Sequence, residues 1–369
     1  MAAPRQPDRL CKINLDVASS MTGPIVEMIR KRCQALEGIR IKVGDTTNPS
    51  ILIQNAFLGG SSPHLREIEL DGISFPFPEI QRVLLSTNNL VELHLSRIPH
   101  AAYFSPNDLV ITLSTLTQLR SLTINFHFPA ASPLPNMSRP PPQRTTLPSL
   151  ISFDFHGASE YLEEFVARID SPSLSKLTVW LFNQIFFDIP QLCQFISNLY
   201  APGSPTEVSV EHSSESVIVS LIRGEGGKSS DTICALGTLC RRLDWQLSFV
   251  TQISTQLSPL LSSIHLLEIP MRFESNVPTG EEEVDATQIQ ELFQPFTRVK
   301  AVYVWQKKLV PGIVRALVTP SEDMGAGVLP ELASLHLTGC RKSSSVAKAA
   351  KQIVAMRSLS GQTVSLSGL

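Results

Sequence analysis

The chain contains 369 residues, of which 43% are hydrophobic and 17% are charged, and its formal net charge is −2. This composition supports a large buried core and differs from that of disordered chains, which are poor in apolar residues and rich in charge. The small net charge provides no general attraction to nucleic acid or to an anionic membrane. We therefore expect a folded protein with neither a nucleic-acid partner nor a membrane partner.

The N-terminal segment MAAPRQPDRL lacks the apolar core of a secretion signal. No run of residues reaches the roughly 18 apolar positions that a membrane-spanning helix requires. Six cysteines are scattered along the chain, without a C-x-x-C pair or a histidine at metal-ligand spacing. They predict reduced thiols and no metal site. We expect a cytoplasmic location, with the nucleus as an alternative.

An L-x-x-L-x-L pattern recurs along the chain, with Ile, Val or Phe in place of some leucines. Successive copies begin 26, 29, 25, 29, 31 and 24 residues apart, then 90, 35 and 33, and the gap of 90 leaves room for three further units. Leucine-rich repeats run about 20 to 29 residues, and longer when each carries a full helix. The copies are Leu10-Ile13-Leu15, Leu36-Ile39-Ile41, Leu65-Ile68-Leu70, Leu90-Leu93-Leu95, Leu119-Leu122-Ile124, Leu150-Phe153-Phe155, Leu174-Leu177-Val179, Ile264-Leu267-Ile269, Val299-Val302-Val304 and Leu332-Leu335-Leu337.

Between these copies the apolar residues recur with a helical period, as in segments 162–169, 192–199 and 289–296. Each unit therefore combines one strand with one helix, and neither element can bury its apolar face alone. Stacking the units gives a parallel sheet on the inside of a curve and helices on the outside. We predict an α/β fold, a leucine-rich-repeat horseshoe solenoid with irregular repeats, as a single domain over residues 10–369.

Two segments interrupt the repeat. Seven prolines between residues 129 and 149 exclude a helix or an inner strand and predict a proline-rich loop insertion. Residues 203–250 form an irregular segment, in which TEVSVE (206–211) and SVIVSLIR (216–223) are close enough to pair as a strand hairpin. The segment RLDWQLSFV (242–250) then predicts a return to the repeat pattern.

The segment VIVSLIRGEGGKSS, at 217–230, suggests a phosphate-binding loop, which requires a strand, a glycine-rich turn ending in Gly-Lys, and a helix. Such a loop also has a glycine five positions before the Gly-Lys pair, and that position here is Ile222. A nucleotide-binding protein is therefore a remote alternative, and a simple glycine turn is favoured. Because nucleophile and metal motifs are also lacking, we expect no enzymatic activity, no catalytic residues and no cofactor.

The third and fifth positions of the motif remain as candidates for function. Strand alternation turns these positions away from the core, toward the inner face of the predicted curve. They could be ordinary solvated residues, but together they predict a partner-binding surface with an acidic centre that suits a basic patch on another protein. The candidates are Glu67, Glu69, Glu92, His94, Thr123, Asp154 and Thr178.

Four segments resemble the leucine-rich-repeat region of the F-box proteins of mushroom-forming (basidiomycete) fungi. These segments are SPHLREIELDGISFPFP (62–78), LVELHLSRIPHAAYFSPNDLVITLSTLTQLRSLTINF (90–126), CRRLDWQLSFVTQI (240–253) and FTRVKAVYVWQKKLVPGIVRALV (296–318). The resemblance implies a protein-recognition module, the substrate-binding portion of an F-box-type ubiquitin-ligase subunit.

The same resemblance implies an F-box of about 45 residues before the repeats, where only MAAPRQPDR stands here. We therefore expect the chain to lack its F-box, and to bind the adaptor of a cullin-RING ligase only if an F-box is restored. The alternative is a stand-alone repeat scaffold with no ubiquitin-ligase link.

Overall fold

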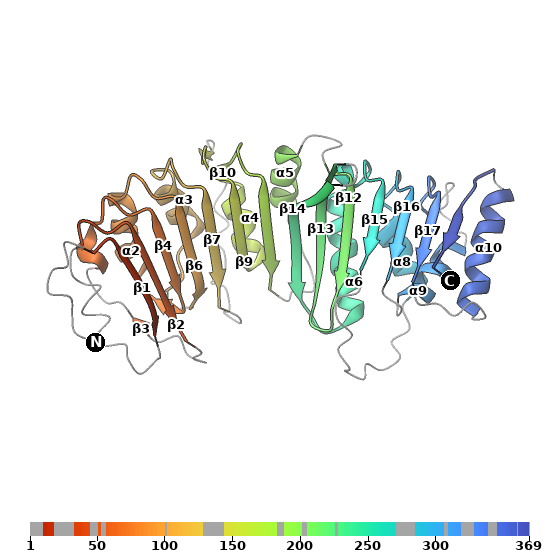
Figure 1. The fold of residues 1–369 in the computed structure, drawn as a ribbon, viewed down its shortest axis with the longest axis horizontal. Coiled ribbons are helices and arrows are strands. Elements are labelled where there is room, and N and C mark those ends of the chain that lie inside the picture. The colour runs from red at the N-terminus through yellow and green to blue at the C-terminus, as the bar shows by residue number, and fades with distance from the viewer. Residues whose placement is uncertain are drawn as a thin grey trace. The chain divides into compact units, whose positions relative to one another are not determined.

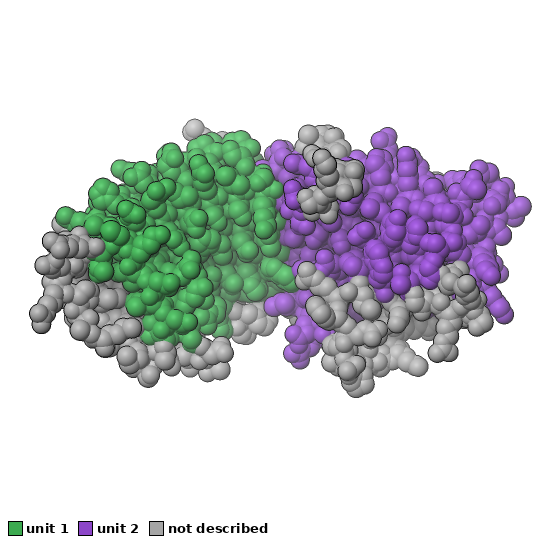
Figure 2. Space-filling view, viewed as in Figure 1, with its two compact units in different colours: residues 1–182 green, residues 183–369 purple. Residues whose placement is uncertain are grey.

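The structure is a computed structural model, and its contacts gather in two compact units, residues 1–182 and 183–369 (Figure 2). Both units combine a sheet with helices, so the chain is α/β, as predicted. Among the described residues, no helix combines the length and the hydrophobicity needed to cross a membrane. The structure describes residues 10–17, 33–44, 51–52, 57–99, 102–127, 144–182, 188–200, 205–225, 228–270, 285–305, 309–318, 328–338, 345–359 and 361–368.

The main sheet of the first unit is entirely parallel, and its strands are neighbours in the order in which they follow along the chain (Figure 1). Parallel neighbours need a crossover connection, which is why a whole repeat separates each pair of strands. The strands are β1 (Lys12–Val17), β2 (Gly38–Val43), β4 (Glu67–Asp71), β6 (Glu92–Ile98), β7 (Ser121–Phe126), β9 (Ser152–Gly157) and β11 (Lys176–Leu181).

The register of these strands aligns the repeat motif. From the second copy on, the middle apolar position of each copy in this unit stands directly opposite that of the next, and at most 1% of each of these side chains is exposed. Their stacking forms one continuous apolar layer beneath the sheet. The apolar surface that this layer removes from water stabilises the fold. The aligned residues are Ile39, Ile68, Leu93, Leu122, Phe153 and Leu177.

The same backbone hydrogen bond closes a turn before the strand in most copies of the motif. The N–H of the first motif residue donates to the carbonyl three residues earlier, as in Leu65 to Ser62 (3.2 Å) and Leu119 to Leu116 (3.1 Å). In the second unit Ile264 donates to Leu261 in the same way (3.1 Å). The repeat is therefore a repeat of backbone hydrogen bonding as well as of apolar residues.

The helices of the first unit lie on one face of the sheet (Figure 1). They begin where local chemistry favours a helix start: α3 has Pro106 in its first turn, and the hydroxyl of Ser105 accepts a hydrogen bond from the N–H of Asp108. The helices are α2 (Phe77–Ser86), α3 (Pro106–Leu113) and α4 (Ser159–Val166), with a 3₁₀ turn, η3, at Phe57–Gly60.

Short strands lie outside the main sheet. The helix predicted at 162–169 ends at Val166. Ile169 lies instead in β10 (Ile169–Asp170), which pairs with β8 (Thr145–Thr146). Likewise β3 (Ile51–Leu52) pairs with β5 (Ile73–Ser74). Thus part of the predicted proline-rich loop, 144–149, contains β8, while residues 129–143 lie outside the described residues.

The sheet of the second unit is only partly parallel. Its strand order is β14-β13-β12-β15-β16-β17-β18, and β13 runs antiparallel to both of its neighbours. Strands β12 and β13 form the antiparallel hairpin expected for TEVSVE and SVIVSLIR, because the turn at 213–215 is too short for a crossover. The strands are β12 (Glu207–His212), β13 (Ser216–Glu225), β14 (Lys228–Leu239), β15 (Leu266–Ile269), β16 (Ala301–Val304), β17 (Ser334–Leu337) and β18 (Ser365–Ser367).

In this unit, helices stand where the sequence predicted further repeats. The prediction that segment 242–250 resumes the repeat is wrong, because it lies in the helix α6; Leu247, Val250 and Ser254 are buried on that helix with helical spacing. The gap of 90 residues thus holds a three-stranded meander and helices in place of three strand-helix units. The helices are α5 (Pro190–Leu199), α6 (Leu243–Gln256), α7 (Ser258–Leu261), α8 (Ala286–Phe293), α9 (Val310–Val318) and α10 (Ser345–Leu359).

Candidate protein-binding surface

The face of the first sheet that points away from the helices carries rows of polar side chains. Parallel register places equivalent positions of neighbouring strands side by side, about 4.8 Å apart along the hydrogen-bonding direction. We call this face, with its three rows, the strand face. Its middle row runs Asn14, Arg40, Glu69, His94, Thr123, Asp154 and Thr178.

All seven residues selected from the sequence lie on the strand face. Glu69, His94, Thr123, Asp154 and Thr178 are consecutive members of the middle row, which crosses five strands. The other two, Glu67 and Glu92, face each other in the neighbouring row. The structure therefore brings together residues that are up to 111 positions apart in the sequence, from 67 to 178.

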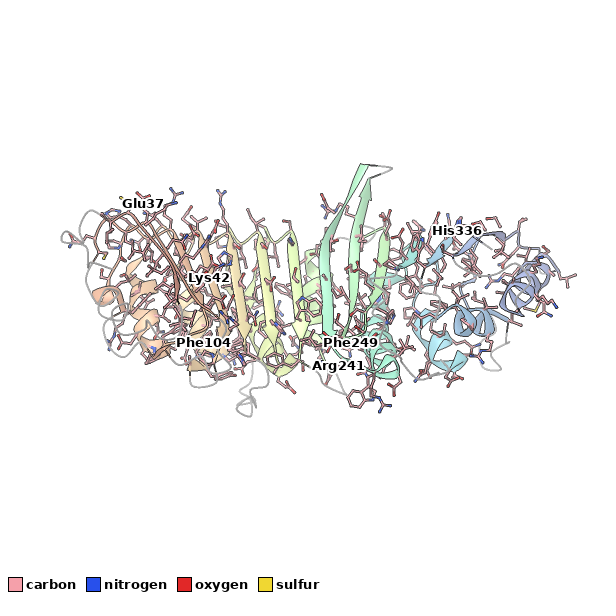
Figure 3. All side chains as sticks on the ribbon, turned by 60° about the horizontal axis from the view of Figure 1, so that its bottom comes forward. Glu37, Lys42, Phe104, Arg241, Phe249 and His336 are labelled. Carbon is pink, nitrogen blue, oxygen red and sulfur yellow. The ribbon has the colours of Figure 1, made fainter. Side chains whose placement is uncertain are left out.

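The acidic centre of the strand face is neutralised by β2, which the sequence reasoning missed. Arg40 pairs with Glu67 at 3.0 Å and also with Glu69, and Lys42 pairs with Glu69 at 2.8 Å. Figure 3 labels Lys42 on its strand. The signal was available, because Arg40 is the fifth position of the second motif copy. This part of the surface is therefore a charge mosaic, not an acidic patch.

The ion pairs hold Glu69 in its charged form. Burial by itself would raise the pKa of this carboxyl, but a hydrogen bond from Lys42 and the positive charges of Arg40 and Lys42 outweigh that effect and lower it. The Glu69 side chain is 17% exposed, whereas Arg40 and Lys42 are 43% and 44% exposed. The carboxylate is thus fixed in place while its cationic partners still face solvent.

His94 connects the acidic side of the strand face with its hydroxyl side. Its Nδ1 lies 2.8 Å from the hydroxyl oxygen of Thr123, and its Nε2 lies 3.6 Å from a carboxylate oxygen of Glu92. Contacts at both ring nitrogens orient the imidazole on the sheet. The ring is therefore held in one orientation on this face.

Asp154 is the most shielded of the predicted carboxyls. Burial raises its pKa, although the nearby charges of Lys176 and His94 act in the opposite direction. A carboxylate in this position gains from a hydrogen-bond donor or a cation brought by a partner, since either one favours its charged form.

A third row of the strand face begins with Asp16 and Lys42 and continues with Asp71 and Ser96. Arg97 reaches across it, donating from Nε to Asp71 at 2.5 Å and from a terminal nitrogen to the carbonyl of Val43 at 2.5 Å. One guanidinium thereby links three neighbouring strands. It reinforces the register on which the rows depend.

The glycine-rich segment of the second unit forms a hairpin. Strands β13 and β14 pair antiparallel out to Glu225 and Lys228. The element after the turn is thus a strand, and a helix N-terminus, whose N–H groups would surround phosphates, does not follow Lys228. Within the described residues, no three His, Cys, Asp or Glu side chains gather as metal ligands.

The chain matches no protein-family model, and no curated protein matches it significantly.

Proposed function

We propose that the chain is a non-enzymatic protein-recognition module, built as an irregular leucine-rich-repeat solenoid of horseshoe shape. Two observations support this architecture: the motif residues align on consecutive parallel strands, and the same backbone turn precedes strands in both units. In such a solenoid the sheet lines the concave side and the helices lie outside. The strand face is then the surface that a partner contacts.

The observation that carries the proposal is the middle row of the strand face. Its side chains stand on a sheet that backbone hydrogen bonds hold rigid, and several of them are already fixed by ion pairs and by the contacts of His94. Fixed side chains lose little conformational entropy on binding. A broad, polar, preorganised face suits another protein better than a small molecule, which requires a concave and mostly apolar pocket.

The charge mosaic changes the kind of partner that we expect. Three carboxylates, those of Glu67, Glu69 and Asp71, already have the cations of Arg40, Lys42 and Arg97 beside them. A purely basic partner would meet repulsion from these cations as well as attraction. We therefore propose a partner of mixed charge, whose pattern complements the mosaic and excludes other proteins.

Site-specific photocrosslinking tests the proposal. A photoreactive residue in place of Thr123 reports on the strand face, and one in place of Ile111, which is 54% exposed on α3, reports on the opposite face. We expect a captured partner to crosslink through position 123 and not through position 111. Crosslinks at 111 alone would contradict the proposed surface. As a control, Thr123→Arg is expected to abolish capture without a change in thermal melting.

We further propose that this recognition serves substrate selection in an F-box-type ubiquitin ligase, within the cytoplasm or nucleus. Support comes from the resemblance of the repeat segments, and from the described cysteines, none of which forms a disulfide, as fits a reducing compartment. An F-box encoded in frame upstream of Met1 would favour this setting. Stop codons there would favour the alternative, a repeat scaffold without a ligase link.

A further inference from the structure

The second unit has an outward sheet face of a different chemistry. Its strands β12, β15, β16, β17 and β18 align one row of side chains that point away from the buried valines and leucines. The row runs Ser209, Glu268, Tyr303, His336 and Ser367, with Glu207 at the start of β12 in the row beside it.

Two aromatic rings of this row, with the ring of Trp305 just after β16, stack in nearly parallel planes and form a group that we call the platform. The rings of Tyr303 and His336 lie 4.1 Å apart and only 3° from parallel, and the ring of Trp305 stacks on Tyr303 at 5.6 Å and 16°. All three side chains are partly exposed, while Val302 and Val304, the residues before and after Tyr303, are fully buried. Contact between Ser367 and the Nδ1 of His336 fixes the imidazole (His336 is labelled in Figure 3).

A pair of carboxylates lies beside the platform. Glu268 stands directly opposite Tyr303 in the sheet register, and Glu207 is close enough to add to the effect of burial in raising the pKa of Glu268. Two like charges at a half-buried site stabilise each other's protonated form and attract any cation. The two neighbouring carboxylates therefore favour a positive charge beside them.

The described outward positions of this face hold no lysine or arginine that would supply this positive charge. On β12 and β15 to β18 these positions are Glu207, Ser209, Glu211, Leu266, Glu268, Ala301, Tyr303, Ser334, His336, Ser365 and Ser367. The strand face of the first unit is different, because cations on β2 and β6 neutralise its carboxylates. The two faces therefore suit different ligands.

We propose that this second face binds an arginine side chain of a partner protein, with the guanidinium stacked on the Tyr303 platform and paired with Glu268 and Glu207. A guanidinium is planar and delocalised, so it can stack on an aromatic face while its N–H groups donate to carboxylates. The ammonium of lysine lacks the flat surface and the fork of donors. Nucleobases could stack, but their phosphates would be repelled by the carboxylates. The proposal is independent of binding at the strand face of the first unit.

A titration with short peptides tests the site. The probe is a glycine-serine peptide with two arginines, followed by calorimetry and by the fluorescence of Trp305, whose environment the stacked guanidinium would change. Otherwise identical peptides carry lysine or citrulline, which keep the charge or the planar shape alone. We expect saturable binding of the arginine peptide and at least about tenfold weaker binding of both analogues.

Variants locate the binding. Glu268→Gln and Tyr303→Leu are each expected to weaken the arginine peptide at least about tenfold, because each removes one half of the recognition. Glu291→Gln removes an exposed carboxylate from α8 of the same unit and is expected to leave binding unchanged. Equal affinity for the lysine peptide, no saturable binding of the arginine peptide, or an unaltered affinity in Glu268→Gln with retained thermal melting would each overturn the proposal.

Discussion

His212 is a buried histidine at the end of β12, with only 2% of its surface exposed. Its Nδ1 lies 3.1 Å from the side-chain oxygen of Gln246 on α6, and the amide nitrogen of Gln246 donates to the carbonyls of Ser213 and Cys240. Burial lowers the pKa of His212 to about 4, although the hydrogen bond with Gln246 acts in the opposite direction. This imidazole is therefore neutral in the folded protein over a wide pH range.

Acidification should selectively weaken the second unit through His212. The folded-state pKa of about 4 is lower than the unfolded value of roughly 6.5, so the stability contributed by the neutral ring is complete above pH 6.5 and is lost as pH falls toward 4. We expect a loss of about 2 kcal/mol in the free energy of unfolding between pH 7.5 and 5 from this group. Urea unfolding at both pH values measures it.

The matched control for that measurement is the exposed His265. His212→Asn should flatten the pH dependence of unfolding, whereas His265→Asn should leave it as in the parent protein. Equal pH dependence in the parent and the His212 variant would show that this histidine does not control acid stability.

At the scale of elements, Arg97 near the end of β6 combines an unusual backbone conformation with side-chain contacts that reinforce the sheet. Arg97 has a φ of 49° at the register shift between Leu95 and Ile98, a conformation that non-glycine residues rarely adopt. Its guanidinium lies over Gly72, whose own φ is 71° and whose N–H donates to the carbonyl of Ser96 at 3.0 Å. The turn after β4 and the distorted end of β6 thus depend on each other.

Gly72→Ala should destabilise the first unit by two effects. The left-handed φ costs about 1 to 2 kcal/mol for alanine, and a Cβ would lie 3.2 Å from the guanidinium of Arg97. Gly60→Ala is the control, because its φ is 77° but nothing lies within 4 Å of its Cβ. We expect urea unfolding to show a larger loss for Gly72→Ala. A loss no greater than that of Gly60→Ala would mean that Arg97 moves aside freely.

At the scale of the whole molecule, each of the two units has its own apolar core. In the first unit the aligned motif residues, Leu93 among them, form the layer beneath the sheet; in the second, Leu267, Val302 and Leu335 occupy the equivalent positions. In repeat architectures each repeat contacts mainly its neighbours, so a local defect reduces local stability first.

Leu93→Ala should therefore cost about 2 to 5 kcal/mol, because it removes buried apolar surface and leaves a cavity. Hydrogen exchange should show the loss of protection concentrated in β4, β6 and β7, with β15 to β17 largely retained. Glu92→Ala alters the adjacent, outward residue and should change neither protection nor melting temperature appreciably. An equal loss in both variants, or a uniform loss over both units, would contradict this description of the core.

The sequence alone predicted what depends on local periodicity. The L-x-x-L-x-L spacing identified Ile68, Leu93 and Leu122 as core residues, and alternation then placed Glu69 and His94 on the opposite face. Both deductions hold because side chains along a strand alternate strictly between the two faces of the sheet. This alternation is kept whenever equivalent positions of two repeats pair. The α/β class follows from the same alternation of strand and helix periods.

Only the tertiary structure decided how separate repeats meet. Neutralisation of Glu67 by Arg40 and the stacking of Tyr303 on His336 join residues 27 and 33 positions apart, and both depend on which strands become neighbours. The helix α6 also escaped prediction, because short apolar runs fit a strand or a helix equally well until their packing partners are known. Local pattern thus determines which face a side chain occupies, while packing determines the charges and rings beside it.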